Sequence, residues 1–246
     1  MTAAASALAG RGILITRSED DCAEWAAEIE RRGARAVLLP CIRCEELDTP
    51  ELRDALGAAL EKAHWFVATS RRGVEAVARL RAPRTPLAPR TRVAVVGSAT
   101  AAASRELLGR ADLVGSGTAA KLGATLAAGA IKPGARVVLA LAENAGEALE
   151  HALSSAGVNC TRLDVYRTVP APPAANKRSL SSLGAECVVL ASPSAAAGFV
   201  HQVDVDVPVA IYTIGPSTTA AARELGLAVT AEARKPSFES IWEAMQ

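Results

Sequence analysis

Short apolar runs alternate with longer amphipathic stretches along almost the whole chain. Runs such as Gly12–Thr16 and Trp65–Thr69 have the length and the β-branched content of buried strands. Stretches such as Pro50–Ala63 have the polar face and apolar spacing of helices. Because predicted strands and helices alternate, the pattern favours parallel sheets that are covered by helices on both faces.

One strand–turn–helix unit occurs twice in the sequence. Val209–Leu225 reads V-A-I-Y-T-I-G-P-S-T-T-A-A-A-R-E-L, and Arg92–Leu107 repeats this pattern without a gap. The helix that follows each glycine is predicted to begin at a hydroxyl cap, which in the second copy is Ser217 or Thr218. Further matches link Gly10–Ile15 to Gly134–Leu139, Ala68–Ser70 to Leu190–Ser192, Gly97 to Gly215 and Thr100 to Thr218. The chain is therefore expected to hold two α/β copies of about 120 residues each.

Two proline-rich or polar crossings interrupt the pattern, near residues 40–47 and 167–177. Simple tandem domains would need only one crossing, near residue 130. We therefore predict an inserted domain. The first domain comprises residues 1–40 and 172–246, the second comprises residues 45–167, and the connectors are residues 41–44 and 168–171. Each domain is predicted to be a flavodoxin-like, doubly wound parallel sheet of about five strands.

Composition narrows the possible partners. Half of the residues are hydrophobic but only 3% are aromatic, so Ala, Val, Leu and Ile must form the core. The formal net charge of +1 argues against nucleic acid and anionic membranes as partners. Five scattered cysteines, an odd number, fit a reducing compartment, and the apolar opening lacks the basic residues of a secretory signal. No apolar run is long enough to span a bilayer. We expect a cytoplasmic protein.

Conventional catalytic signatures are weak. His64, His151 and His201 are isolated, and surface or packing roles account for them. The spacing of Cys41-x-x-Cys44 suits a metal or redox site, but no second pair accompanies it. The motif Gly115-x-Gly117-x-x-Ala120 is similar to a dinucleotide fingerprint, yet a tight turn that leads into a helix explains it better. We predict no metal and no cofactor.

Five turns rich in glycine and hydroxyl groups follow predicted strands. They are Thr16-Arg17, Thr69-Ser70, Gly97-Ser98-Ala99-Thr100, Ser192-Pro193-Ser194 and Gly215-Pro216-Ser217-Thr218. Open parallel sheets bind ligands beyond the carboxyl ends of their strands. A single turn of this kind could be an ordinary helix cap, but five of them favour donors for a polyanion in a cleft between two domains.

Tyr166, one of two tyrosines, lies where a long apolar strand meets the second crossing. It is either an aromatic anchor for the linker or a phenol that can donate a proton.

Six motifs in this order resemble the uroporphyrinogen-III synthase family. They are L-I-T-R at 14–17, A-T-S-R-R-G-V at 68–74, V-G-S-A-T-A at 96–101, V-Y-R-T at 165–168, S-P-S at 192–194 and I-G-P-S-T-T-A at 214–220. The resemblance implies two α/β domains, the second inserted into the first, with a two-stranded linker. It also implies a cofactor-free, monomeric enzyme that closes linear hydroxymethylbilane into uroporphyrinogen III and inverts ring D.

The family's chemistry gives each candidate residue an expected role. Loss of the hydroxyl yields an azafulvene, a substituted pyrrole carbon attacks it, and a spiro intermediate fragments and recloses. By resemblance, Tyr166 assists the departure of the hydroxyl, and Arg17 could meet one of the eight substrate carboxylates. The residues expected to line the cleft are Ser70, Gly97, Ser98, Thr100, Ser192, Ser194, Gly215, Ser217 and Thr218. Ala195 and Ser217 depart from the common family residues, and neither change removes a donor.

Two other hypotheses remain at this point. The first is a non-catalytic tetrapyrrole-binding or sensor protein on the same scaffold, because a fold does not fix a function. The second is a two-domain binding protein for another small anion. The retention of Tyr166 and both glycine turns favours the enzyme, and a secretory signal would have favoured the anion-binding protein.

Overall fold

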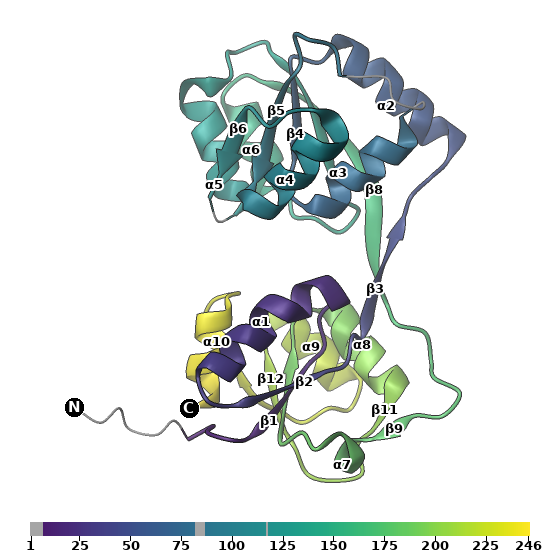
Figure 1. Ribbon diagram of the computed structural model, residues 1–246, viewed down its shortest axis with the longest axis vertical. Coiled ribbons are helices and arrows are strands. Elements are labelled where there is room, and N and C mark those ends of the chain that lie inside the picture. Colours follow the sequence, from purple (N-terminus) through teal and green to yellow (C-terminus); the bar gives the residue numbers. More distant parts are fainter. Residues whose placement is uncertain (1–6, 82–86, 117) are drawn as a thin grey trace, which may run out of the picture. The chain divides into compact units, whose positions relative to one another are not determined.

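The computed structural model describes residues 7–81, 87–116 and 118–246 (Figure 1). The first six residues, residues 82–86, and Gly117 of the glycine motif fall outside the described residues. The chain divides into two compact units: unit 1 is Met1–Cys44 with Val169–Gln246, and unit 2 is Glu45–Thr168. Both units consist of a sheet with helices, so the predicted α/β class with parallel strands is confirmed.

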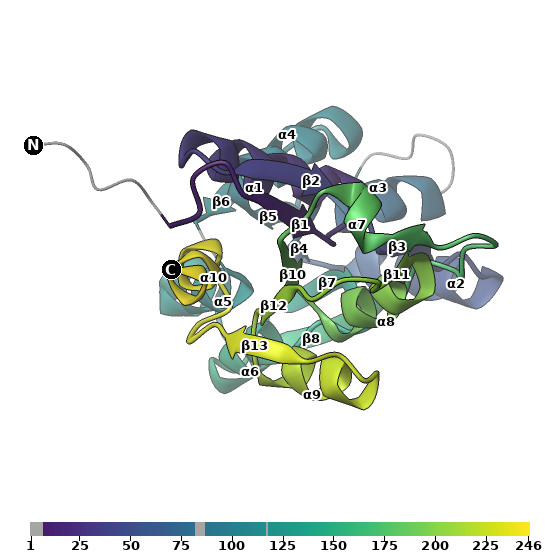
Figure 2. The same ribbon diagram turned by 90° about the horizontal axis from the view of Figure 1, so that it is seen from below.

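The sheet of unit 1 has five parallel strands in the order β13-β12-β10-β1-β2 (Figure 2). The strands are β1 (Gly12–Ile15), β2 (Arg35–Leu38), β10 (Cys187–Leu190), β12 (Ala210–Thr213) and β13 (Val229–Glu232). Alternate residues of β1 face opposite sides, as strand geometry requires. Ile13 and Ile15 pack with Trp25 and Ile241 in one cluster, whereas Leu14 packs with Phe199 in the other.

These two clusters separate the helices of unit 1. Helices α1 (Glu19–Arg31) and α10 (Phe238–Met245) cover the first face. Helices α8 (Pro193–Gln202) and α9 (Pro216–Glu224) and the short α7 (Leu180–Leu183) cover the second. Two short strands, β9 (Arg178–Ser179) and β11 (Val203–Asp204), form a separate parallel pair. The sequence did not predict this pair because two residues are too few to show an alternation.

The sheet of unit 2 has the strand order β3-β8-β7-β4-β5-β6. The strands are β3 (Ile42–Glu46), β4 (Trp65–Ala68), β5 (Arg92–Val96), β6 (Leu113–Gly115), β7 (Arg136–Ala142) and β8 (Asn159–Pro170). Helix α5 (Ala119–Thr125), the π-helical turn η1 (Leu126–Ala130) and α6 (Ala148–Ser155) cover one face. Helices α2 (Pro50–Lys62), α3 (Arg71–Leu80) and α4 (Gly97–Leu108) bury their apolar sides on the other. No helix in the described ranges is both long and apolar enough to cross a membrane.

The sequence repeat and the two units do not coincide. By sequence, β1 matches β7, β4 matches β10 and β5 matches β12, and chain order then pairs β2 with β8 and β6 with β13. When each strand of unit 1 is replaced by its match, the order becomes β6-β5-β4-β7-β8. This is the spatial order of the five parallel strands of unit 2. Each unit therefore takes two strands from one copy and three from the other. When the parallel strands of each unit are numbered in chain order, unit 1 has the flavodoxin order 2-1-3-4-5. Unit 2 has the order 3-2-1-4-5, because its first parallel strand, β4, is the central one.

Two neighbouring strands, β3 and β8, cross the boundary between the units. The Leu47 amide donates to the Val165 carbonyl at 3.0 Å, and the Ala171 amide donates to the Cys41 carbonyl at 2.8 Å. The strands are antiparallel, since residue numbers rise along one as they fall along the other. The two-stranded linker that the family resemblance implies is therefore present, and the segment near residues 40–47, which the residue pattern marked only as a crossing, contains strand β3. Its backbone pairs with a strand that lies more than 100 residues away in the sequence, and no local pattern reports such a partner.

Candidate functional site

The carboxyl ends of the central strands carry the predicted binding turns in both units. In unit 1, the helices that follow β10 and β12 lie on one face of the sheet, and the helix that follows β1 lies on the other. In unit 2, the same change of face occurs between β4 and β7. Open α/β sheets bind ligands at this kind of switch point. Each unit therefore offers a candidate ligand-binding edge of its own.

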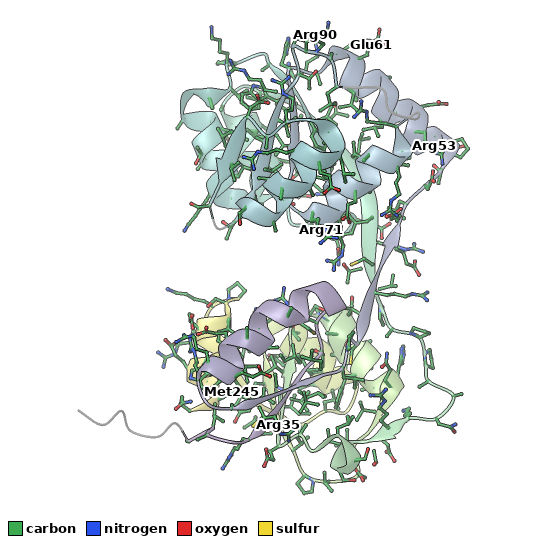
Figure 3. The ribbon with its side chains drawn as sticks, viewed as in Figure 1. Arg35, Arg53, Glu61, Arg71, Arg90 and Met245 are labelled. Carbon is green, nitrogen blue, oxygen red and sulfur yellow. The ribbon has the colours of Figure 1, made fainter. Side chains whose placement is uncertain are left out.

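Ser70 follows β4 and is the N-cap of α3. Its Oγ accepts a hydrogen bond from the Gly73 amide at 3.1 Å. Helix α3 begins at Arg71. Figure 3 shows Arg71 at this end of unit 2 and Arg90 and Glu61 at the opposite end. Ser70 is only partly exposed, so its hydroxyl belongs to the edge of the sheet rather than to open solvent.

Tyr166 lies in β8 and contacts Ser70 directly. The phenolic oxygen is 2.9 Å from Ser70 Oγ, and 8% of the residue is exposed. The β7–β8 register shifts here: Leu141 pairs with Asp164, whereas Ala142 pairs with Tyr166. Val165 is therefore an extra residue, which makes a β-bulge, and bulges change the direction in which a side chain points. The bulge thus helps to direct Tyr166 toward Ser70.

The bond between Ser70 and Tyr166 spans a strand. Strand β7 lies between β4 and β8, so the two residues come from strands roughly 10 Å apart. Helix α3 approaches β7 closely, since a Cβ added at Gly73 would lie 2.9 Å from the carbonyl oxygen of Ala140. This glycine lets the first turn of α3 lie against β7, and Ser70 can then meet a tyrosine from the next strand.

The first glycine turn also lies at this edge of unit 2. Helix α4 begins at Gly97, which has φ +76, a left-handed conformation that glycine adopts without strain. Ser98 is exposed, whereas only 5% of Thr100 is exposed. Among the described residues, no side chain caps the start of α4. The turn therefore presents the Ser98 hydroxyl, and Thr100 packs inside the unit.

In unit 1, the edge begins with Ser192 and Arg17. Ser192 is the N-cap of α8, and its Oγ accepts from the Ala195 amide at 3.0 Å. Ser194 lies in the first turn of α8 and is partly exposed. The Arg17 guanidinium stacks on Trp25 at 4.6 Å from the ring centre. The Thr16 hydroxyl donates to the Val189 carbonyl at 2.7 Å, which ties the end of β1 to β10.

The second glycine turn differs from its twin. Gly215 is extended, with φ 169, and is itself the N-cap of α9, so the prediction that Ser217 or Thr218 caps this helix is wrong. Pro216 occupies the first helical position, so the cap lies two residues before Ser217, the first hydroxyl of the turn. Ser217 is exposed, and Thr218 is buried with 1% exposure.

Sequence reasoning missed Thr219, which organises the base of this second turn. Its Oγ1 lies 2.5 Å from Glu232 Oε2 and 2.6 Å from Thr213 Oγ1, and both threonines are buried. The sequence repeat directed attention to Thr218 because Thr218, and not Thr219, matches Thr100. The carboxylate partner comes from β13, and only the fold brings it near. This network supports the turn from inside unit 1.

The histidines have the structural roles expected of them. His64 Nδ1 accepts from the Arg136 amide at 3.0 Å, and His201 Nδ1 lies 2.9 Å from the Ala171 carbonyl oxygen. His151 is exposed near Glu147. Burial raises the pKa of the Cys41 thiol to about 12, so it stays protonated at neutral pH. Across the residues that the structure describes, no three His, Cys, Asp or Glu side chains gather as metal ligands would.

Comparison with known proteins decides the family. The family model for uroporphyrinogen-III synthase HemD matches residues 23–243. The chain belongs to the uroporphyrinogen-III synthase family. A chloroplastic uroporphyrinogen-III synthase of Oryza sativa subsp. japonica is 29% identical over 250 residues, which is 95% of this chain and 80% of the rice protein.

Solved uroporphyrinogen-III synthases share the fold at low sequence identity. A mutant form from the extreme thermophile Thermus thermophilus has a TM-score of 0.53 at 19% identity, and the match covers 96% of this chain and 97% of the Thermus chain. The enzyme from Helicobacter pylori has a TM-score of 0.55 at 15% identity, with 95% and 97% covered. The family resemblance inferred from the six motifs is therefore confirmed, and with it the assignment to the enzymes of tetrapyrrole biosynthesis.

Proposed function

We propose that this uroporphyrinogen-III synthase closes linear hydroxymethylbilane into uroporphyrinogen III with inversion of ring D. The family match over residues 23–243 is the observation that carries the proposal. The reaction needs a polyanion held in a folded conformation and a proton donor for a leaving hydroxyl. The two candidate edges supply donors for carboxylates, and the buried Tyr166 supplies a phenol.

The reaction balances without an oxidant or a cofactor. The substrate hydroxyl takes up a proton and leaves as water, and the adjacent pyrrole nitrogen supplies the electron pair that forms the azafulvene. The substituted carbon of the terminal pyrrole attacks, and the resulting spiro intermediate breaks one carbon–carbon bond and forms another. Loss of a proton restores the aromatic pyrrole. The protein's main contribution is then the alignment of the two ends, which is worth a large effective concentration.

Tyr166 is proposed as the group that assists departure of the hydroxyl, either directly or through a water molecule. A phenol is a suitable donor to an oxygen leaving group, and general acid catalysis typically contributes about 10²–10⁴-fold. The 2.9 Å bond to Ser70 holds the phenolic oxygen in place at the carboxyl edge of unit 2. Fixed position favours this role over that of a linker anchor.

The carboxylates are proposed to bind the surface groups at each edge. Ser98 and Ser217 offer exposed hydroxyls, and Arg17, Ser192 and Ser194 are partly exposed. Gly97 and Gly215 would contribute their amides at the starts of α4 and α9, where the positive end of the helix dipole favours an anion. Thr100 and Thr218 are buried, so we propose that they act through the backbone of these first turns.

Product analysis tests the function. Purified protein would be incubated with hydroxymethylbilane, and the type I and type III products would be separated after oxidation. We expect type III to predominate, because type I is the isomer that forms spontaneously. Only type I in the presence of the protein would reject the enzyme and leave a tetrapyrrole-binding protein.

We further propose that the enzyme is a cytoplasmic monomer. Its five cysteines are all free thiols, and three of them are buried, which suits a reducing compartment. Light scattering at increasing concentration would test the oligomeric state, with a constant mass of about 25 kDa expected. A mass that rises toward twice this value would contradict the monomer.

A further inference from the structure

We infer that Ser70 is a positioning residue that donates its hydroxyl proton to Tyr166 and thereby turns the phenolic proton toward the substrate. The inference rests on the proposed function and adds a role that the sequence did not suggest. By sequence motif, Ser70 is expected among the groups that bind substrate directly. Its contacts in the structure point to an action through Tyr166.

The contact between Ser70 and Tyr166 allows either oxygen to donate, and the proposed role of Tyr166 selects donation by Ser70. A serine hydroxyl has one proton and two acceptor sites. Ser70 Oγ already accepts from the Gly73 amide at 3.1 Å, and Tyr166 Oη at 2.9 Å is its other partner in the described structure. A proton given by Ser70 to Tyr166 satisfies both groups. The opposite direction would use the only proton of Tyr166 and leave none for the leaving hydroxyl.

The resulting chain of donors starts at a helix. The Gly73 N–H, the Ser70 O–H and the Tyr166 O–H would follow one another in the same sense, and each hydrogen bond polarises the next. The first donor lies in the opening turn of α3, a ten-residue helix whose positive dipole end lies here. This arrangement makes the phenol a stronger donor than an isolated tyrosine.

Backbone contacts fix the positions of Ser70 and Tyr166. The bulge at Val165 sets the direction of Tyr166, and the Glu143 amide donates to the Tyr166 carbonyl at 2.8 Å. The close approach of Gly73 to Ala140 fixes the start of α3 against β7. The end of the β7–β8 pairing and the close approach of α3 therefore both support one side-chain contact.

Kinetics of three variants test the role of Ser70. Ser70→Gly removes the hydroxyl but keeps a residue that is accepted at an N-cap. We expect kcat for type III formation to fall by roughly tenfold, the size of one hydrogen bond, while KM changes by less than about twofold. Ser70→Thr keeps a hydroxyl and should restore most of the rate.

The matched control is Thr49→Ala in the same unit. Thr49 caps α2 through a 3.2 Å bond from the Leu52 amide and has no part in the proposed site. Loss of this cap should leave kcat and KM unchanged. A Ser70→Gly variant with raised KM and unchanged kcat would show direct substrate binding, and would overturn the positioning role. Equal losses in Ser70→Gly and Thr49→Ala would also overturn it.

A spectroscopic measurement tests the same contact without substrate. The chain has two tyrosines, so Tyr212→Phe leaves Tyr166 as the only source of tyrosinate absorbance. A donor bond from Ser70 stabilises the phenolate, and Ser70→Gly in this background should move the appearance of tyrosinate to higher pH. No movement, or movement to lower pH, would contradict donation by Ser70. Because no substrate is needed, this result is separable from failure of the proposed function, which type III formation by the unaltered protein tests.

Discussion

Two serines at matching positions of the two units cap their helices alike and differ in what else they contact. Ser70 accepts from the Gly73 amide at 3.1 Å, and Ser192 accepts from the Ala195 amide at 3.0 Å. Ser70 also bonds Tyr166. The sequence repeat thus specifies the cap, and the chemistry depends on a neighbour that the repeat does not supply.

The difference arises from the strands at one side of each sheet. In unit 1, β2 ends at Leu38, shortly before Pro40. In unit 2, the matching strand β8 has 12 residues and includes the bulge and Tyr166. The candidate proton donor therefore lies on the longer of the two matching strands.

The first test of this comparison adds a methyl group, in each unit, to the glycine that lies closest to the backbone of another segment. A Cβ at Gly198 would lie 1.7 Å from the Cys41 carbonyl oxygen, and a Cβ at Gly73 would lie 2.9 Å from the Ala140 oxygen. Overpacking typically costs about 1–3 kcal/mol, and we expect Gly198→Ala to lie at or above the upper end and Gly73→Ala near the lower. Denaturant unfolding would measure both. Equal free energies of unfolding for the two variants would contradict the difference in fit.

The second test uses the two glycine turns. Gly97 has φ +76, whereas Gly215 is extended and has open space around its Cα. Gly97→Ala should destabilise the protein by about 1–2 kcal/mol, because an L-residue is strained in the left-handed region. Gly215→Ala should change the free energy of unfolding by less than about 0.5 kcal/mol. A loss of stability above this limit in Gly215→Ala would contradict the difference between the two glycine turns.

The third test separates the cap from the contact with Tyr166. Ser192→Ala should cost about 1 kcal/mol of stability for the lost cap. Ser70→Ala should cost about 1 kcal/mol more, because it also leaves Tyr166 without this partner. In a Tyr166→Phe background the extra cost should vanish. An unchanged extra cost in that background would place its origin elsewhere in unit 2.

The smallest effect concerns a charge cluster that is confined to unit 1. Glu28 accepts hydrogen bonds from Arg31 and Arg32, in that order of importance, and they lower its pKa from 4.5 to about 2. A lowered pKa in the folded state stabilises the protein above pH 4.5, and this contribution is lost as the pH falls toward 2. Glu28→Gln should therefore be less stable than the unaltered protein at neutral pH, and this difference should shrink as the pH falls toward 2 and vanish below it. A difference that stays constant with pH would contradict the assignment.

Sequence patterns predicted most of the scaffold because its signals are local. The alternation of Gly12–Thr16 and Trp65–Thr69 with helical stretches gave the α/β class, and the repeat located the turns at the strand ends. The local pattern did not show β3 as a strand because its partner β8 is distant in the sequence, and only the family resemblance implied a two-stranded linker. The bulge at Val165 could not be predicted from the sequence, because the bulged residue is not a glycine.

The candidate site was harder to predict because its decisive contacts join distant segments. Tyr166 was singled out by its place at a junction, yet its bond to Ser70 joins residues 96 positions apart. Thr219 was overlooked because its partner Glu232 lies on another strand. Burial of Thr100 and Thr218 likewise depends on packing that the shared motif does not record.

The most direct measurement compares the isomers formed by Tyr166→Phe and Tyr212→Phe. The two tyrosines lie in different units, and Tyr212 belongs to the core of unit 1. With hydroxymethylbilane as substrate, we expect Tyr166→Phe to form type III product at least about 100-fold more slowly, so that spontaneous type I accumulates. Tyr212→Phe should still yield type III at nearly the unaltered rate. Normal type III formation by Tyr166→Phe would contradict the central claim that the phenol of unit 2 assists the departure of the hydroxyl.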